Sequence, residues 1–291
     1  MFPFKILDGA MGSELIKRGL VLHEHTWSAD ANINHPDLIE QIHREYVDAG
    51  ADFITTNTFR TTPRAYAKTG LGNLNSEESV YKAKTALEKA VELARRAAIS
   101  STKIIGSIAP LEDCYKPNLF PGKDIAVSEF SLLGNWLIDA GVDLLVFETM
   151  NSLAETEAGL IALQDCNHPF WVSFILKNDN CLLSGDSLCD ALSTLNKYNI
   201  DMVLLNCNPL LRTKNAVDII VENWHRDWGI YPNLGKGEPE LLGNITDYES
   251  KDKFLSVIEY ALNAGASVVG ACCGSSPEHI KEINTLHYNV V

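Results

Sequence analysis

Three cysteines, far apart in the chain, could act together on one substrate. Cys207 follows the apolar run 202–205, and Cys272 and Cys273 are adjacent and flanked by glycines. Thiolates are preferred ligands of Zn²⁺, and three of them leave one tetrahedral position open, as in catalytic rather than structural zinc sites. A substrate thiol bound at that position would be held as the thiolate, which is the nucleophilic form of sulfur.

Cysteine is also among the residue types most often buried in protein cores. Spacing alone therefore leaves two interpretations of the trio open, a metal site and three core thiols. The other cysteines, at positions 114, 166, 181 and 189, are interpreted as ordinary core or loop thiols. An odd total of seven, scattered along the chain, favours reduced thiols over a disulfide framework and hence a cytoplasmic protein.

A repeated junction indicates how helices and strands alternate. At Gly50, Gly141 and Gly265 a helical pattern ends at glycine, and an apolar strand pattern begins within three residues. Continuous apolar or β-rich runs, typical of strands buried on both faces, are separated by amphipathic stretches such as Pro36–Ala49. The predicted strands are Phe4–Leu7, Phe53–Thr56, Ile104–Ala109, Leu144–Phe147, Phe170–Leu176, Met202–Leu205, Trp228–Tyr231 and Val268–Cys272.

Eight such strands in 291 residues favour an α/β fold with a single (β/α)₈ TIM barrel over residues 1–291, with a doubly wound sheet as the alternative. Active sites of barrels lie at the carboxyl ends of the strands, and strands of equal parity contribute to the same layer. The three cysteines end the sixth and eighth strands, so they can converge. Adjacent residues of a regular strand point to opposite faces, so Cys272 and Cys273 can share a metal only where the backbone is irregular. We expect the loop 113–124 to shape the substrate mouth.

The formal charge of −14 disfavours nucleic acid and anionic membranes as partners, because their phosphates would be repelled. No apolar run approaches the roughly 18 residues of a membrane span, and the first residues lack a signal-peptide pattern. The partners are therefore expected to be small molecules, with a cationic one favoured by the charge.

Motifs along nearly the whole chain resemble the homocysteine S-methyltransferase family, which includes betaine-, S-methylmethionine- and S-adenosylmethionine-dependent enzymes. The resemblance is carried by several motifs in the correct order. They are Leu7-Asp8-Gly9-Ala10-Met11-Gly12-Ser13, Trp27-Ser28-Ala29, Thr56-Asn57-Thr58-Phe59, Gly106-Ser107-Ile108, Phe147-Glu148-Thr149, Asn206-Cys207, Tyr231-Pro232-Asn233 and Cys272-Cys273-Gly274.

This resemblance implies transfer of a methyl group to the thiol of homocysteine, giving methionine, with Zn²⁺ on Cys207, Cys272 and Cys273. It places Glu148 at the amino group of homocysteine, and Asp8 and Gly9 at the amino-acid end of that substrate. Asn57 and Asn233 would line the pocket. The ordinary alternatives are an acid paired with a neighbouring cation for Glu148 and local turn hydrogen bonds for Asp8, Asn57 and Asn233.

The chain departs from the family at the pocket floor and on the donor side. Leu205 and Ala271 replace glycines, and the segment 108–115 differs from the family's glycine- and tyrosine-containing turn. The methyl donor is therefore left open between a sulfonium and an ammonium compound. Methylfolate is disfavoured, because the chain is too short for the folate and cobalamin modules of the cobalamin enzyme.

Two other functions are compatible with the residues. A phosphate-handling or Schiff-base barrel would use Gly274-Ser275-Ser276 at a helix start and Lys177 at the end of the fifth strand. A non-catalytic zinc or thiol sensor would bind metal without turning over a methyl donor.

Overall fold

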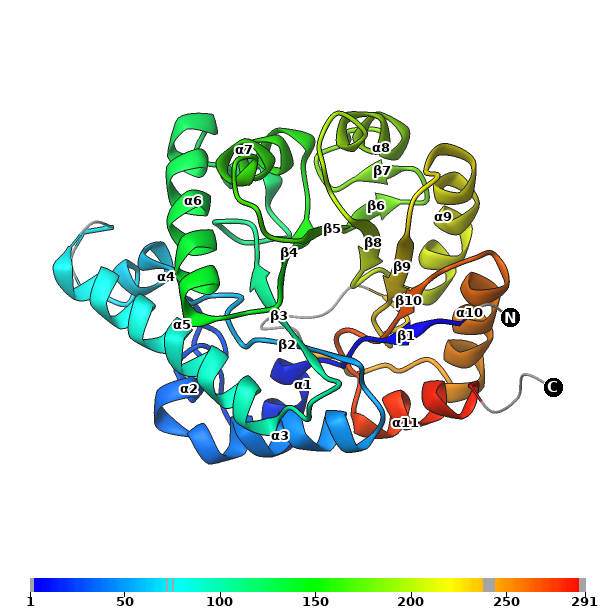
Figure 1. The fold of residues 1–291 in the computed structure, drawn as a ribbon, viewed down its shortest axis with the longest axis horizontal. Helices are drawn as coiled ribbons and strands as arrows, with labels where there is room; N and C mark the ends of the chain where they lie inside the picture. The colour runs from blue at the N-terminus through cyan, green and yellow to red at the C-terminus, as the bar shows by residue number, and fades with distance from the viewer. Residues whose placement is uncertain (1–2, 72, 75, 238–243, 288–291) are drawn as a thin grey trace.

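Eight parallel strands form the centre of the computed structural model, which describes residues 3–71, 73–74, 76–237 and 244–287 (Figure 1). Their order is β1-β10-β9-β8-β5-β4-β3-β2, and a parallel bridge between Leu7 and Phe53 joins the two outermost strands. The predicted (β/α)₈ barrel is confirmed. The strands are β1 (Lys5–Ile6), β2 (Phe53–Thr55), β3 (Lys103–Ile108), β4 (Leu144–Met150), β5 (Phe170–Phe174), β8 (Met202–Asn206), β9 (Trp228–Tyr231) and β10 (Val268–Val269).

Helices surround this barrel in Figure 1. Several begin at a serine: the Ser152 hydroxyl accepts a hydrogen bond from the amide of Glu155, and Ser276 precedes a first-turn proline. No helix in the described part of the chain is long and apolar enough to cross a membrane. The helices are α1 (Met11–Lys17), α2 (Ala31–Asn34), α3 (Pro36–Asp48), α4 (Pro63–Ala67), α5 (Glu77–Ala97), α6 (Lys123–Ala140), α7 (Leu153–Leu163), α8 (Leu188–Leu195), α9 (Leu210–Asn223), α10 (Lys251–Asn263) and α11 (Pro277–Thr285).

Apolar side chains fill the inside of the barrel as well as the layer between strands and helices. Burial of each large side chain stabilises the fold by about 1.5–3 kcal/mol. The barrel is therefore a packed core, and chemistry belongs to the loops at the strand ends. The inner cluster consists of Leu7, Ile105, Leu144, Val146, Trp171, Met202, Leu204, Tyr231 and Val268.

Several predicted strand bounds are off by one residue, and three are off by more, all at the carboxyl end of the barrel. The predicted strand Leu144–Phe147 continues to Met150 in β4. The run 170–176 divides into β5 and β6 (Leu176–Asn178), and β6 forms an antiparallel hairpin with β7 (Cys181–Leu182). The predicted strand Val268–Cys272 is regular only over β10. Beyond Val269 the chain still bonds to both neighbours, since Gly270 donates to Ile230 and Ala271 to Asp8, but it leaves the ladder. This is the irregular backbone that the cysteine pair requires.

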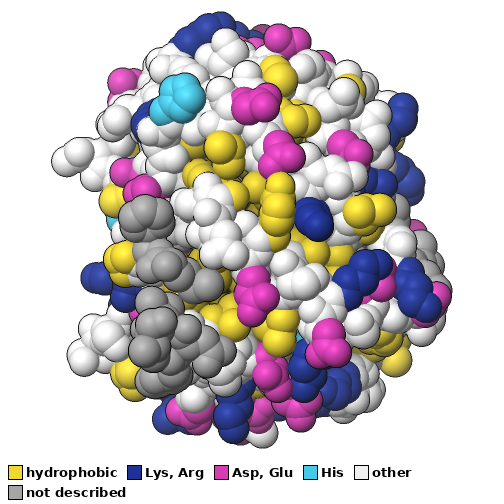
Figure 2. All heavy atoms as spheres, turned by 90° about the vertical axis from the view of Figure 1, so that its right-hand side faces the viewer, with side chains coloured by type: hydrophobic (Ala, Val, Ile, Leu, Met, Phe, Trp, Pro, Cys, Tyr) yellow, Lys and Arg dark blue, Asp and Glu magenta, His cyan; other side chains and the backbone are white. Residues whose placement is uncertain are grey.

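The face shown in Figure 2 carries acidic and basic side chains, with hydrophobic side chains between them. Surface ion pairs such as Lys251–Glu282, at 3.1 Å, are partly exposed. Exposed pairs contribute only about 0–1 kcal/mol each, because water and salt screen them. The apolar layers, rather than these pairs, hold the strand ends in position.

Candidate active site

The structure brings the sulfur atoms of Cys207, Cys272 and Cys273 within 4.8 Å of one another. The sulfurs of Cys207 and Cys273 are 3.4 Å apart. Ligands on a tetrahedral zinc with Zn–S bonds of about 2.3 Å lie about 3.8 Å apart. Three soft donors at this spacing, two of them buried, could hold a metal ion while leaving a further position for a substrate sulfur.

The backbone of Cys207 adopts a left-handed conformation, with φ 54°. Such a conformation costs a non-glycine residue about 1–3 kcal/mol and is found where the surroundings impose it. Here the amide of Cys207 donates to the Tyr231 carbonyl at 3.1 Å, and the Asn233 side chain donates to the Cys207 carbonyl at 2.8 Å. Asn233 therefore lies beside the sulfur cluster, and its hydrogen bond helps to hold the backbone of Cys207 in this conformation.

A second left-handed residue, Thr149 with φ 60°, follows Glu148 in β4. The Asn206 side chain accepts from the Thr149 amide at 3.0 Å and donates to the Thr149 hydroxyl at 2.7 Å. The pairing of β4 with β5 shifts register between Phe147 and Met150, an irregularity often found beside active sites. Asn206 directly precedes Cys207, so these bonds connect the segment that carries Glu148 to the segment that carries Cys207.

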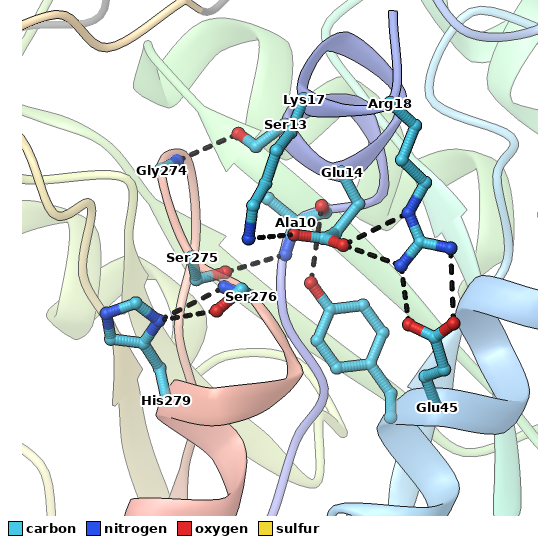
Figure 3. A network of polar contacts seen from close by, with 11 residues as sticks. Ala10, Ser13, Glu14, Lys17, Arg18, Glu45, Gly274, Ser275, Ser276 and His279 are labelled. Carbon is cyan, nitrogen blue, oxygen red and sulfur yellow. Dashed lines mark hydrogen bonds and ion pairs between the residues drawn. The ribbon is translucent and has the colours of Figure 1, made fainter.

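The segment after β1 is bonded to the loop that carries the cysteine pair, as Figure 3 shows. The Gly274 amide donates to the Ser13 hydroxyl at 2.8 Å, and the Ala10 amide donates to the Ser275 hydroxyl at 2.9 Å. Gly274 has φ 84°, a left-handed conformation that glycine adopts without strain. These bonds hold the loop after β10 beside the predicted substrate-binding residues Asp8 and Gly9.

Gly9 lies where no side chain would fit. A Cβ atom there would come within 2.5 Å of the Ser275 hydroxyl and 2.8 Å of the Tyr46 ring. The backbone at Gly9 therefore lies close to both Ser275 and Tyr46.

Figure 3 also shows Arg18 between Glu14 and Glu45, and these ion pairs join α1 to α3.

Glu148 is half-buried and accepts a hydrogen bond from the Ser107 hydroxyl at 2.6 Å. Burial raises its pKa to about 7, while the Ser107 hydrogen bond lowers the pKa and the charge of Cys207 raises it. Asp8 is buried, and burial raises its pKa well above the usual range. Both Asp8 oxygens accept from Thr55, through its amide at 2.8 Å and its hydroxyl at 3.0 Å.

The Asn57 side chain is committed to neighbouring loops. Its amide nitrogen donates to the Ser28 carbonyl at 2.9 Å and to the Asn32 side chain at 2.8 Å, and its oxygen accepts from the Ser28 hydroxyl. Both of its N–H groups are thus used within the protein. This geometry joins the loop after β2 to the segment before α2 and leaves Asn57 no N–H group for a substrate.

The structure does not place the residues of the phosphate or Schiff-base alternative where that chemistry would need them. Lys177 is exposed on the β6–β7 hairpin, outside the eight-stranded barrel. The Gly274 amide and the Ser275 hydroxyl are bonded to the segment after β1, and Ser276 caps α11. A phosphate would have to displace these internal bonds.

Tyr115 is a residue of the site that sequence reasoning did not select. Its hydroxyl lies 3.5 Å from the Cys207 sulfur, and it packs against the buried cluster of Ile175, Cys207, Ile245 and Cys273. The expectation that the loop 113–124 shapes the mouth located the segment, although Lys123 and Asp124 belong to α6. Because Tyr115 is a single tyrosine in a predicted loop, its residue type alone gave no sign that its hydroxyl contacts the Cys207 sulfur.

The three thiols influence one another. Hydrogen bonds from Cys272, and next from Cys273, hold the pKa of Cys207 well below that of an ordinary thiol. The same contacts with Cys207 raise the pKa of the Cys272 and Cys273 thiols. One of the three sulfurs is therefore favoured as a thiolate even before a cation is considered.

Comparisons with known proteins agree with this geometry. The profile of the family described as homocysteine S-methyltransferase matches residues 5–286. The homocysteine S-methyltransferase YbgG of Bacillus subtilis is 29% identical over 299 residues, covering 97% of this chain and 94% of the relative. A selenocysteine methyltransferase of Astragalus bisulcatus is 27% identical, covering 96% and 90%.

A solved structure gives the same result in three dimensions. The metallated form of the homocysteine methyltransferase MmuM from Escherichia coli superposes with a TM-score of 0.83 at 27% identity, covering 98% of this chain and 96% of that one. The match extends over the whole barrel, and the residues matched by the family profile contain all three cysteines of this chain. The chain belongs to the homocysteine S-methyltransferase family.

Proposed function

We propose that this protein transfers a methyl group from a sulfonium or ammonium donor to homocysteine bound at a zinc ion on Cys207, Cys272 and Cys273. The family establishes the coarser part, methyl transfer to the homocysteine thiol to give methionine. The observation that supports the zinc site is the cluster of three sulfurs within 4.8 Å at the strand ends. Zinc, when bound there, would hold the substrate sulfur as a thiolate at neutral pH.

The residues around the cluster would bind and orient homocysteine. In its ionised form Glu148 is an acceptor for the substrate ammonium, and the buried surroundings strengthen that pairing. Asp8 and Gly9 would meet the amino-acid end, mainly through backbone groups, since Thr55 occupies the Asp8 carboxylate. Asn233 would orient Cys207, and Asn57 would hold the surrounding loops.

The reaction would be a direct displacement. The thiol proton would pass to solvent water when the thiol binds, before attack. The substrate sulfur would then form a bond to the methyl carbon, and the bond from that carbon to the donor would break with its electron pair remaining on the donor. A sulfonium donor leaves as a thioether, and an ammonium donor leaves as an amine. The loops holding Glu148 and the cysteines contribute by fixing the acceptor sulfur in line with the methyl carbon.

The decisive experiment combines metal analysis with a donor panel. Purified protein is expected to contain about one zinc per chain. Homocysteine would be incubated with S-methylmethionine, S-adenosylmethionine, betaine and dimethylsulfoniopropionate, and methionine measured. Formation of methionine from one of these donors supports the proposal. Zinc-containing protein that methylates homocysteine from none of them contradicts it and favours the sensor.

The methyl acceptor should be tested in the same way as the donor, because a relative that matches 96% of this chain is a selenocysteine methyltransferase. A selenol would occupy the same open position as a thiol. Homocysteine and selenocysteine would be tested against the best donor, and the ratio of kcat/KM would identify the preferred acceptor.

A further inference from the structure

The loop after β3 is held over the sulfur cluster by contacts on several sides. The Arg60 guanidinium donates to the carbonyls of Pro110 and Glu112, at 2.9 and 2.6 Å. The Leu111 amide donates to Glu155 at 2.8 Å, and the Asn151 side chain donates to the carbonyl of residue 114 at 3.0 Å. A loop bonded to β2, β4 and α7 segments in this way presents its next residue, Tyr115, in a defined position.

The Tyr115 hydroxyl at this position lies 3.5 Å from the Cys207 sulfur, within hydrogen-bonding distance for sulfur. No other hydrogen-bond partner of that hydroxyl occurs among the described residues. Tyr115 contacts only one of the three sulfurs in this way. A Cys207 thiolate has no hydrogen of its own, so the phenol must be the donor when Cys207 is a ligand.

We infer that Tyr115 is a positioning residue whose hydroxyl donates a hydrogen bond to the Cys207 sulfur, and that this bond strengthens metal binding by the cluster and withdraws electron density from that sulfur. Hydrogen bonds to coordinating groups orient them and tune the metal. The inference rests on the proposed function for the presence of the metal, and its test measures the metal site rather than methyl transfer.

The test replaces the phenol without removing the ring. Tyr115→Phe and wild type would be compared for zinc affinity by competition with a chromophoric chelator, and for the sulfur-to-cobalt charge-transfer band after loading with Co²⁺. We expect zinc affinity to fall about tenfold, which is typical for loss of an outer hydrogen bond at a metal site. The band is expected to move to lower energy, because the sulfur becomes a better electron donor.

Tyr260→Phe is the matched control. It removes a phenol hydroxyl whose bond to Asp218, at 2.7 Å, joins surface positions of α10 and α9. Arg60→Met is a second variant that leaves Tyr115 intact but frees the two carbonyls of the loop. It should shift the cobalt band in the same direction as Tyr115→Phe, whereas Tyr260→Phe should leave both readouts unchanged.

Unchanged zinc affinity and an unchanged band in Tyr115→Phe would overturn the inference and reduce Tyr115 to a packing role. A change in cobalt coordination number, visible in the intensity of the d–d bands, would also overturn it, because the phenol oxygen would then be a ligand itself. Protein that takes up no zinc would refute this inference and the zinc proposal together. A confirmed Tyr115 effect in a protein without methyl transfer would refute the proposed function alone.

Discussion

The barrel mouth and the helical layer behind α3 bury polar groups in opposite ways. At the mouth, half-buried Glu148 is bonded to Ser107, and buried Asp8 is bonded to Thr55. On the inner side of α3, His43 is fully buried, and neither ring nitrogen has a hydrogen-bond partner in the described part of the structure. The mouth therefore has internal partners for its acids, whereas the helical layer isolates an imidazole.

Burial disfavours the charged form in both places, with different consequences. It raises the pKa of Glu148 to about 7, where hydrogen bonding restrains the shift and the group can ionise at neutral pH. It lowers the pKa of His43 to about 4, so His43 is neutral throughout the physiological range. An acid that has a hydrogen-bond partner, such as Glu148, can therefore bind a cationic substrate group. A buried imidazole without such a partner only lowers the stability of the fold at low pH.

The largest effect is expected at the sulfurs. Cys207→Ala and Cys273→Ala each remove a proposed metal ligand, so zinc content should fall to near zero and kcat/KM should drop by about 1,000-fold or more. Metal analysis and methionine formation check this. Cys189→Ala, at an exposed thiol on α8, is the control and should change neither. A Cys207→Ala enzyme with full zinc and full turnover would refute the proposed centre.

Glu148→Gln should have the next largest effect. It retains shape but cannot pair as an anion with the substrate ammonium, and a hydrogen bond between charged groups is worth about 2–3 kcal/mol. The KM for homocysteine should therefore rise about 30- to 100-fold, with a smaller change in kcat. Glu278→Gln, at an exposed acid at the start of α11, is the comparison variant. An unchanged KM would assign Glu148 to packing.

His43→Leu should reduce the acid sensitivity of the fold. Because the folded-state pKa lies below the ordinary value of 6.5, the unfolded chain binds more protons between these values, and stability is lost as the pH falls. The wild type should lose about 2 kcal/mol between pH 7.5 and pH 5 from this group. Urea unfolding at both pH values would measure the loss. The variant should lose less, and the exposed-site variant His225→Leu should behave like wild type.

The last prediction concerns the pH dependence of binding at the mouth. Glu148 is charged only above a pH of about 7, so homocysteine binding should weaken about tenfold per pH unit below that value. Measurements of KM from pH 5.5 to 8 would reveal this slope. Glu148→Gln should bind weakly but with a flatter profile. Equal slopes in both enzymes would attribute the pH dependence to another group, such as the substrate thiol.

Most of the fold could be predicted because barrel strands and helices carry local patterns. The glycine at each helix end and the continuous apolar runs located the elements that became α3, β4 and β9. The carboxyl ends were harder, because the β6–β7 hairpin and the two-residue β10 depend on bonds to other segments, such as that from Leu176 to the Asn208 side chain. A run of apolar residues in the sequence does not indicate which distant groups will bond to it.

The candidate site divides in a similar way. The motifs around Cys207, Glu148 and the cysteine pair indicated which residues belong together. They could not indicate that both N–H groups of Asn57 are used by neighbouring loops, that Asn233 holds the carbonyl of Cys207, or that the carboxylate of Asp8 is bonded to Thr55. Each of these facts is a choice among several hydrogen-bond partners.

The order of residue types along this chain was sufficient for the alternation of helix and strand and for the family, and it singled out the three cysteines as candidates, because these depend on local periodicity and short motifs. Only the tertiary structure decided how the sulfurs meet. Left-handed backbone at Cys207, a broken ladder after β10 and bonds from α1 to the loop at Gly274 bring together atoms separated by more than 60 residues. Such convergence depends on packing across the whole barrel, which no local pattern contains.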